Sequence, residues 1–243
     1  MTTILILGAT SDMAASLARK FASEGNHIIL AGRNEAALKP LQTDLNIRYG
    51  VNVHTAAFNA ADFGGHRDFF RNLHLLPDCI ACFFGYLGNQ EIAESDWTEA
   101  NSIISANYTG AVSLLNIAAE LMVERGSGSI IGVSSVAGDR GRMSNYIYGS
   151  AKAGFTAYLS GLRNRLFHKD IHVMTVKPGF VATKMTEDLD LPKVLTASAE
   201  QAAADIYKGW LSKRNVIYTR WFWRYIMLII CCIPEFMFKK LKM

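Results

Sequence analysis

The sequence predicts an α/β fold in which a doubly wound parallel sheet forms a single domain. Two observations carry this prediction. Short apolar runs alternate with amphipathic stretches over most of the chain, which is the pattern of repeated βαβ units. The runs are often β-branched, as strands buried on both faces of a parallel sheet should be. A chain of 243 residues with 50% hydrophobic residues is long enough to bury one such core.

Each element is predicted from its own run of residues. The predicted strands are 4–7, 27–31, 51–57, 79–84, 129–133, 172–176 and 216–218. The predicted helices are 13–24, 35–49, 65–73, 97–124, 145–168 and 199–211. The composition changes only near residue 220, so we expect one domain over 1–219 and an apolar, basic C-terminal extension over 220–243.

Charge is distributed unevenly along the chain. The net charge is +4, which is too small for a dedicated nucleic-acid-binding protein, so no nucleic acid is expected as a partner. Residues 206–243 contain eight Lys or Arg residues and one acid, a net charge of +7, whereas residues 1–205 have a net charge of −3. The basic C-terminal end therefore predicts an anionic surface as its partner.

The cysteines and the N-terminus bear on location. The four cysteines have no spacing typical of a disulfide framework, and no second Cys/His pair completes a zinc site. We therefore expect no metal and a reducing compartment. The N-terminus has neither a basic region nor a cleavage site of a signal peptide. The sequence thus predicts a cytoplasmic protein, peripheral on the inner face of a membrane if its C-terminal end binds one.

A candidate phosphate-binding turn follows the first predicted strand. Residues 8–14 read Gly-Ala-Thr-Ser-Asp-Met-Ala and lead into a helix, where backbone N–H groups can approach a phosphate. Only the first of the three expected glycines is present, because Asp12 and Ala14 occupy the other two positions. An ordinary βα turn, with Asp12 capping the helix, is the alternative. The candidate cofactor-binding residues here are Gly8, Thr10, Ser11, Asp12 and Met13.

The end of the second predicted strand bears on the choice of cofactor. An acidic residue there would bind the ribose 2′-hydroxyl of NAD, whereas an arginine can bind the 2′-phosphate of NADP. The sequence has no acid at this place and has Arg33. For a dinucleotide site, NADP(H) is therefore favoured over NAD(H). The alternative is that Arg33 is a solvated loop residue.

A combination of polar residues predicts a catalytic site. Tyr148 and Lys152 are four residues apart, on one face of a predicted helix. Ser135 follows a predicted strand and precedes Tyr148 by thirteen residues, and Asn107 lies in a long predicted helix upstream. A packed or solvated polar residue is a reasonable explanation for each alone, but a poor one for all four together. Further candidates follow the sixth predicted strand, namely Pro178, Gly179 and Thr183.

This combination resembles the short-chain dehydrogenase/reductase family over about residues 1–219. The resemblance implies a Rossmann fold, an NAD(P) cofactor and the catalytic set Asn107, Ser135, Tyr148 and Lys152. Two departures concern the cofactor side. Residues 82–85 read Cys-Phe-Phe-Gly where the family usually has Asn-Asn-Ala-Gly, so Gly85 alone keeps that motif. An asparagine, Asn59, stands where an Asp usually meets the adenine amino group, and its carbonyl oxygen could do the same.

The resemblance also implies a role for each side chain. Hydride transfer to a ketone builds charge on its oxygen, and Tyr148 would supply the proton. Lys152 and the nicotinamide cation would lower the pKa of that phenol below ~10, and Lys152 would also hold the nicotinamide ribose. Ser135 would hydrogen-bond the substrate oxygen, and Asn107 would hold a water that links Lys152 to solvent. We therefore expect an NADPH-dependent reductase that converts a ketone to a secondary alcohol. A non-catalytic NADP(H)-binding sensor or scaffold is the alternative.

Two further features follow from the resemblance. Members of the family pair through two long helices, here 97–124 and 145–168, so we expect a homodimer or a higher homo-oligomer. The apolar faces of these helices would be shared between the sheet and a partner, and they include Ile103, Leu114, Phe155 and Leu159. Residues 185–196 correspond to the family's lid over the substrate, and Glu187, Asp188 and Asp190 make this segment acidic. A solvated loop face is the alternative explanation for these acids and the one we favour.

The C-terminal end is apolar, aromatic and basic. Its apolar stretch 225–233 has nine residues, whereas a membrane span needs ~20, so we reject a transmembrane helix. Pro234 should break or bend the helix. Aromatic residues favour membrane interfaces and basic residues favour anionic headgroups, so residues 221–243 predict peripheral membrane contact. Packing on the body or on a second subunit is the alternative.

The C-terminal end also sharpens the expected substrate. Together with the Gly-Ala-Thr-Ser turn, it resembles the reductases of lipid-linked keto-sugars, such as decaprenylphosphoryl 2-keto-ribose reductase. A reductase of a long-chain keto-lipid would also explain such an end. We therefore expect a lipid or lipid-linked ketone as the substrate.

Overall fold

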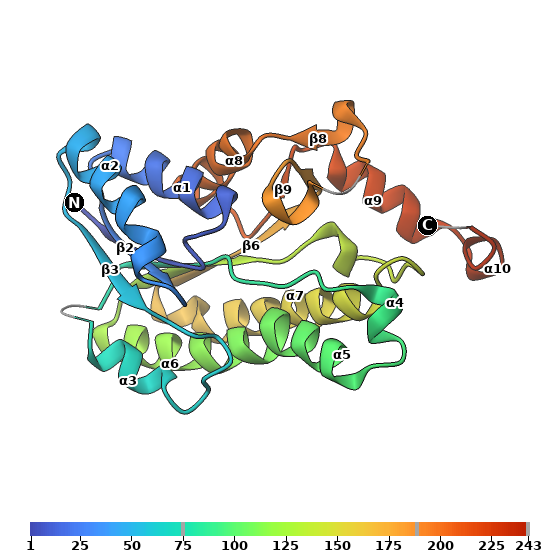
Figure 1. The fold of residues 1–243 in the computed structure, drawn as a ribbon, viewed down its shortest axis with the longest axis horizontal. Helices are drawn as coiled ribbons and strands as arrows, with labels where there is room; N and C mark the ends of the chain where they lie inside the picture. Colours follow the sequence, from blue (N-terminus) through green and yellow to red (C-terminus); the bar gives the residue numbers. More distant parts are fainter. Residues whose placement is uncertain (74–75, 188–189, 242–243) are drawn as a thin grey trace.

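Seven strands form one parallel sheet between two layers of helices (Figure 1). The computed structural model describes residues 1–73, 76–187 and 190–241. The strand order is β3-β2-β1-β4-β5-β6-β9, with every neighbouring pair parallel. Because the order reverses between β1 and β4, this is a doubly wound sheet, and the predicted fold class is confirmed. The strands are β1 (Thr3–Leu7), β2 (His27–Gly32), β3 (Val53–Ala57), β4 (Cys79–Cys82), β5 (Gly128–Val133), β6 (Ile171–Pro178) and β9 (Val216–Thr219).

The helices divide between the two faces of the sheet (Figure 1). One face is covered by α1 (Asp12–Ser23), α2 (Lys39–Tyr49) and α8 (Ala199–Leu211). The other face is covered by α3 (His66–Arg71), α5 (Trp97–Ile104), α6 (Gly110–Arg125) and α7 (Tyr146–Leu166). The remaining elements are short, namely α4 (Gln90–Ala93), α9 (Trp223–Cys232), α10 (Glu235–Phe238), and the paired strands β7 (Phe180–Val181) and β8 (Thr196–Ala197).

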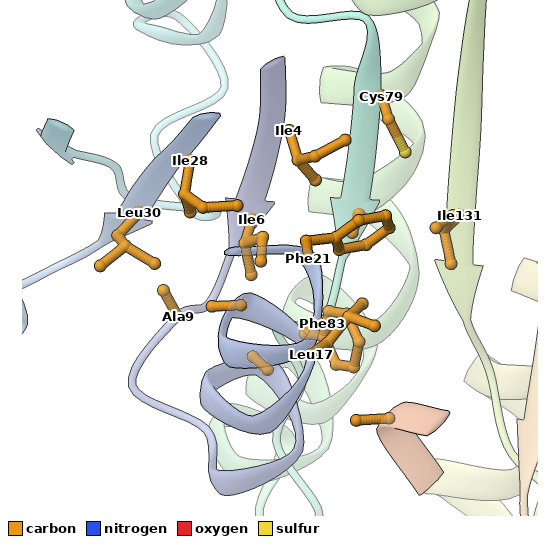
Figure 2. Close-up of a cluster of buried hydrophobic side chains, with 14 of the residues drawn as sticks. Ile4, Ile6, Ala9, Leu17, Phe21, Ile28, Leu30, Cys79, Phe83 and Ile131 are labelled. Atoms are coloured by element: carbon orange, nitrogen blue, oxygen red, sulfur yellow. The ribbon is translucent and has the colours of Figure 1, made fainter. Parts of the chain in front are cut away.

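Side chains of each central strand alternate between the two helical layers. Ile4 and Ile6 of β1 pack in the cluster that also holds Phe21 of α1 (Figure 2). Leu5 and Leu7 pack on the other side, against α6 and α7. All of these side chains are fully buried, and each contributes roughly 1.5–3 kcal/mol to stability. The sheet is therefore a rigid platform for the polar residues at its carboxyl end.

The predicted helix 97–124 is interrupted, which corrects that prediction. A π-helical turn, Ser105–Thr109, separates α5 from α6. Asn107 lies in this turn, and its Nδ2 donates to Ile103 O at 2.8 Å and to Tyr86 O. A side-chain amide that bonds a carbonyl four residues back competes with the backbone ladder, and such turns are frequent at functional sites.

The apolar faces of the long helices pack inward. Ile103, Leu114, Phe155 and Leu159 are all buried within the one chain. The expectation that these side chains are shared with a partner subunit is therefore wrong, because the sheet and its neighbouring helices already cover them. Any subunit contact of these helices has to use their outer faces.

The C-terminal end packs on the body through one face of α9. Trp223 and Met227 are buried in a cluster with Val136. As predicted, Pro234 separates α9 from α10, because α9 ends at Cys232 and Pro234 precedes the first residue of α10. In the described part of the chain, no helix has the length and apolar content that crossing a membrane requires. The outward face of the two helices carries Tyr225, Leu228, Ile229, Phe236 and Met237, all exposed.

Candidate active site

The four candidate catalytic residues lie near one another at the carboxyl end of the sheet. Tyr148 and Lys152 are one helical turn apart on α7, with the Lys152 ammonium 5.7 Å from the centre of the Tyr148 ring. Ser135, which follows β5, lies close enough to Tyr148 for its side chain to lower the pKa of the Tyr148 phenol. The structure thus brings together residues that are up to 45 positions apart in the sequence, from Asn107 to Lys152.

Gly85 allows Asn107 and Lys152 to approach the end of β4. A Cβ at residue 85 would lie 2.6 Å from Asn107 Oδ1 and 3.4 Å from Lys152 Nζ. The Asn107 side chain donates to Tyr86 O and accepts from Tyr86 N at 3.4 Å, so it fixes the backbone after Gly85. A water held between Asn107 and Lys152 stays a prediction.

Burial shifts the pKa values of Tyr148 and Lys152 in the directions that favour the neutral form of each side chain. It raises the pKa of Tyr148 to about 12, against a smaller opposite effect of the Ser135 side chain. It lowers the pKa of Lys152 to about 8. We expected Lys152 to lower the pKa of Tyr148. In the polypeptide without its cofactor, burial raises this pKa instead, and the joint effect expected of Lys152 and the nicotinamide cation stays a prediction.

The first turn is shaped by its glycine. Gly8 has φ +79°, and a Cβ there would lie 2.7 Å from Phe84 N, so the turn fits against the end of β4 only with glycine. Ser11 is the N-cap residue of α1, but its side chain makes no capping hydrogen bond. Asp12 does not cap the helix either, because its carboxylate accepts from Lys184 N at 2.8 Å. The capping alternative for Asp12 is therefore wrong.

A cavity lies along the segment that follows β6, beside Asp12 of this turn. Its volume is ≈590 Å³, and Asp12 and Thr183 are among its lining residues. Thr10 is exposed, whereas Met13 is partly buried against two core clusters. Of the acidic residues predicted in the lid, Glu187 and Asp190 line the cavity, and Asp188 lies outside the described residues.

The two candidates on the adenosine side are both exposed. Arg33 follows the end of β2 and, among the described residues, makes no hydrogen bond or ion pair. Asn59 uses its side-chain oxygen locally, accepting from Ala61 N at 3.1 Å. The Asn59 carbonyl is bonded to the buried ring of His66, which holds this loop in place.

Sequence reasoning missed Trp223 as a neighbour of the site. Its indole lies against Gly179, where any Cβ would overlap the ring, and its Nε1 donates to Leu195 O at 3.3 Å. Pro178 and Gly179 end β6, so α9 supports this turn from outside. The spacing of Trp223 and Met227, four residues apart, was a signal that α9 has a buried face.

A second missed feature is a buried ion pair beside the site. Lys177 Nζ lies 2.5 Å from Asp139 Oδ1, and the Tyr218 hydroxyl donates to Asp139 Oδ2 at 3.0 Å. Lys177 directly precedes Pro178, and Asp139 ends the 3-10 turn that begins after Ser135. The pair therefore fixes the loop after β5 against the end of β6. No sequence signal joins two residues 38 positions apart.

Comparison with known proteins decides the family. The chain matches the short chain dehydrogenase family over residues 2–193. This protein is a member of the short-chain dehydrogenase/reductase family. The predicted family is thus confirmed, and with it an NAD(P)-dependent oxidoreductase.

Relatives of this short-chain dehydrogenase cover most of its length. An uncharacterised oxidoreductase of Mycobacterium tuberculosis is 33% identical over 98% of this chain and 96% of its own. A serine 3-dehydrogenase of Rhizobium radiobacter is 29% identical over 85% of this chain and 80% of its own. A short-chain dehydrogenase from Sphingobium yanoikuyae, solved in complex with NADPH, superimposes with a TM-score of 0.82 at 22% identity, over 97% of each chain. That likeness establishes the fold.

The residues at the site fit the dinucleotide that the family uses. Lys152 Nζ donates to Val133 O at 3.1 Å, and the described residues offer its two other N–H groups no acceptor. A buried ammonium with spare donors suits the hydroxyls of a ribose. The first-turn amides of α1 are also free of side-chain caps, as a phosphate site at a helix N-terminus requires.

Proposed function

We propose that this protein reduces a ketone to a secondary alcohol with NADPH, on a lipid or lipid-linked substrate. The observation that carries the proposal is the grouping of Tyr148, Ser135 and Lys152 at the carboxyl end of the sheet, where Ser135 acts on the pKa of Tyr148 and the Lys152 ammonium lies 5.7 Å from the centre of the Tyr148 ring. In a doubly wound sheet this is the end where ligands bind.

The proposed mechanism assigns one task to each side chain. Bound NADPH supplies the hydride. Tyr148, whose pKa of about 12 keeps it protonated near neutral pH, gives its proton to the developing alkoxide. Ser135 donates a hydrogen bond to the same oxygen and so stabilises its charge. Lys152 keeps its ammonium beside the tyrosine and binds ribose hydroxyls with its spare donors.

The preference for NADPH rests on Arg33. Its guanidinium is exposed beyond the end of β2 and is free of partners among the described residues. A free guanidinium at this place suits a 2′-phosphate, because arginine binds phosphate through paired N–H groups.

The lipid part of the proposal rests on the C-terminal helices. Their outward face joins exposed aromatic and aliphatic side chains to the basic residues Arg220, Arg224, Lys239 and Lys240, while Lys242 lies outside the described residues. A surface of this kind suits the interface of an anionic membrane. Since α9 packs beside Gly179 and Val136, a membrane bound there would lie close to the site.

The test is NADPH oxidation over a panel of soluble and micellar ketones. Tyr148→Phe should lower the rate about 10²–10⁴-fold, because it removes the proton donor and leaves the ring in place. Tyr146→Phe is the matched control, since Tyr146 is exposed on the same helix and should keep full activity. Unchanged turnover in Tyr148→Phe would contradict the assignment.

A further inference from the structure

Two unpartnered polar atoms lie in the loop between Ser135 and Tyr148. Arg142 Nε and Asn145 Oδ1 are both covered by the protein and have no hydrogen-bond partner. Among the described residues only Thr219 Oγ1 is in the same state. A buried polar atom without a partner costs free energy, and native structures contain few of them. Two in one short loop therefore need an explanation.

Arg142 also lacks a counter-charge. Its hydrogen bond within the described residues goes to Met227 Sδ at 3.2 Å, and a thioether is a weak acceptor. The nearby Asp139 has both carboxylate oxygens engaged, by Lys177 and by Tyr218. No described acid forms an ion pair with Arg142, and burial lowers the pKa of its guanidinium in spite of Asp139. The guanidinium is thus half-buried with its charge unmatched.

Contacts of the loop link Arg142 to the neighbours of both Tyr148 and Ser135. Arg142 O accepts from Asn145 N at 3.2 Å, and Asn145 O accepts from Gly149 N at 2.8 Å, next to Tyr148. On the other side, Met227 packs with Val136, the residue that follows Ser135. These contacts connect Arg142 to the first turn of α7, which carries Tyr148, and to the residue that follows Ser135.

The side chain of Asn145 does not cap the helix that it precedes. It is the N-cap residue of α7, where an asparagine oxygen usually accepts from the first-turn amides, yet its side chain makes no such bond. Its Oδ1 needs a donor, such as a hydroxyl group, whereas the Arg142 guanidinium needs an anionic oxygen. Both residues are only partly buried, so part of each side chain already reaches the surface.

We propose that Arg142 and Asn145 bind an anionic oxygen group and a hydroxyl of the ketone substrate. The substrate class is then a hydroxylated ketone that carries a phosphate or a carboxylate, which arginine binds through paired N–H groups. This inference rests on the proposed ketone reduction and names the class of its substrate. Arg142 determines specificity and takes no part in proton transfer.

The test measures binding of two matched ketones to the protein saturated with NADP⁺, in which no reduction can occur. Dihydroxyacetone phosphate and dihydroxyacetone share the ketone and a hydroxyl and differ in the phosphate. By calorimetry the phosphate ester should bind at least about tenfold more tightly, the usual effect of a charged hydrogen bond. Arg142→Gln should abolish that preference, and Arg142→Lys should keep part of it. Affinity for NADP⁺ should stay unchanged in both variants and so show that they fold.

Arg224→Gln is the matched control, because it removes the same charge from an exposed position on α9 and should keep the preference. Equal binding of the two ketones, absence of binding by both, or a full preference in Arg142→Gln overturns the inference. Loss of binding to anionic vesicles in Arg142→Gln, with the ketone preference intact, also overturns it and assigns Arg142 to a lipid headgroup. Failure of the proposed reduction looks different. The phosphate ester would then still bind, while no ketone supports NADPH oxidation.

Discussion

The indole of Trp223 occupies the space beside Gly179 that the side chain of any other residue would need. Its ring meets Phe180 edge-on with centroids 5.0 Å apart, and Trp223 is only 3% exposed. The C-terminal helix therefore braces the turn at the end of β6, where the candidate cofactor-binding residues Pro178 and Gly179 lie.

Removal of this indole should destabilise the fold. We expect Trp223→Ala to lower the free energy of unfolding by about 3–5 kcal/mol, the range for a buried aromatic residue truncated to alanine. Trp221→Ala is the matched control, because Trp221 is 74% exposed and its loss should change stability by less than about 0.5 kcal/mol. Urea denaturation of both variants measures the difference. Equal effects would mean that α9 does not brace the body.

The catalytic set could be predicted because its signals are local. Tyr148 and Lys152 are one helical turn apart, and Ser135 ends a buried strand whose neighbours in a parallel sheet all end at the same edge. The contacts of Trp223 and Arg142 were beyond prediction, because they join positions 28 and 85 residues apart. The rise in the pKa of Tyr148 that burial causes in the protein without cofactor was missed for a related reason. Its burial depends on the packing of the whole site, which no short pattern reveals.

The pKa of Lys152 predicts how reduction depends on pH. Burial lowers this pKa to about 8, so the ammonium is present below pH 8 and is lost as the pH rises through that value. If the ammonium holds the ribose, log kcat/KM should be flat below about pH 8 and fall above it. Lys152→Arg stays charged and should lose this fall, though at lower activity. A profile of kcat/KM from pH 6 to 10 checks this, and a flat wild-type profile would contradict it.

Arg33 predicts a selective effect on the cofactor. Arg33→Ala should weaken NADPH binding much more than NADH binding, since NADPH alone carries the 2′-phosphate. Loss of a charged hydrogen bond corresponds to about 1.5–3 kcal/mol, or roughly tenfold to a hundredfold. Arg48→Ala is the control, because Arg48 is exposed on α2 and already paired with Asp44. Fluorescence titration with NADPH and with NADH measures the two affinities. Equal losses of affinity for the two cofactors in Arg33→Ala would refute the role of Arg33 in binding the 2′-phosphate.

The outer faces of α5 to α7 predict a homodimer. Tyr108 is 36% exposed and rests on Gly154 of α7, which has no side chain to cover it. We expect light scattering at micromolar concentration to give a dimer, and Tyr108→Arg to shift it toward the monomer by placing a charge in the contact. A wild-type monomer under the same conditions would rule this assembly out.

The last prediction concerns membrane binding by the C-terminal helices, and it is tested with single substitutions instead of a truncation. Removing residues 221–243 would also remove Trp223 and Met227 from a buried cluster, so a truncated protein would lose structure as well as any membrane contact. Single substitutions on the outward face avoid this. Ile229 is 67% exposed on α9, and Ile47 is 80% exposed on α2, at the other end of the molecule (Figure 1).

We expect the wild-type protein to co-sediment with anionic vesicles at low salt and Ile229→Ser to bind them less, with Ile47→Ser unchanged. Arg224→Gln should cost ~1 kcal/mol of binding, about fivefold, and salt should screen that contribution but not the apolar one. The alternative is that this face contacts a second subunit. Ile229→Ser would then change the oligomeric state measured by light scattering, and the wild-type protein would not co-sediment with vesicles. That result would also remove the main support for a lipid-linked ketone, because the lipid part of the proposal rests on this face.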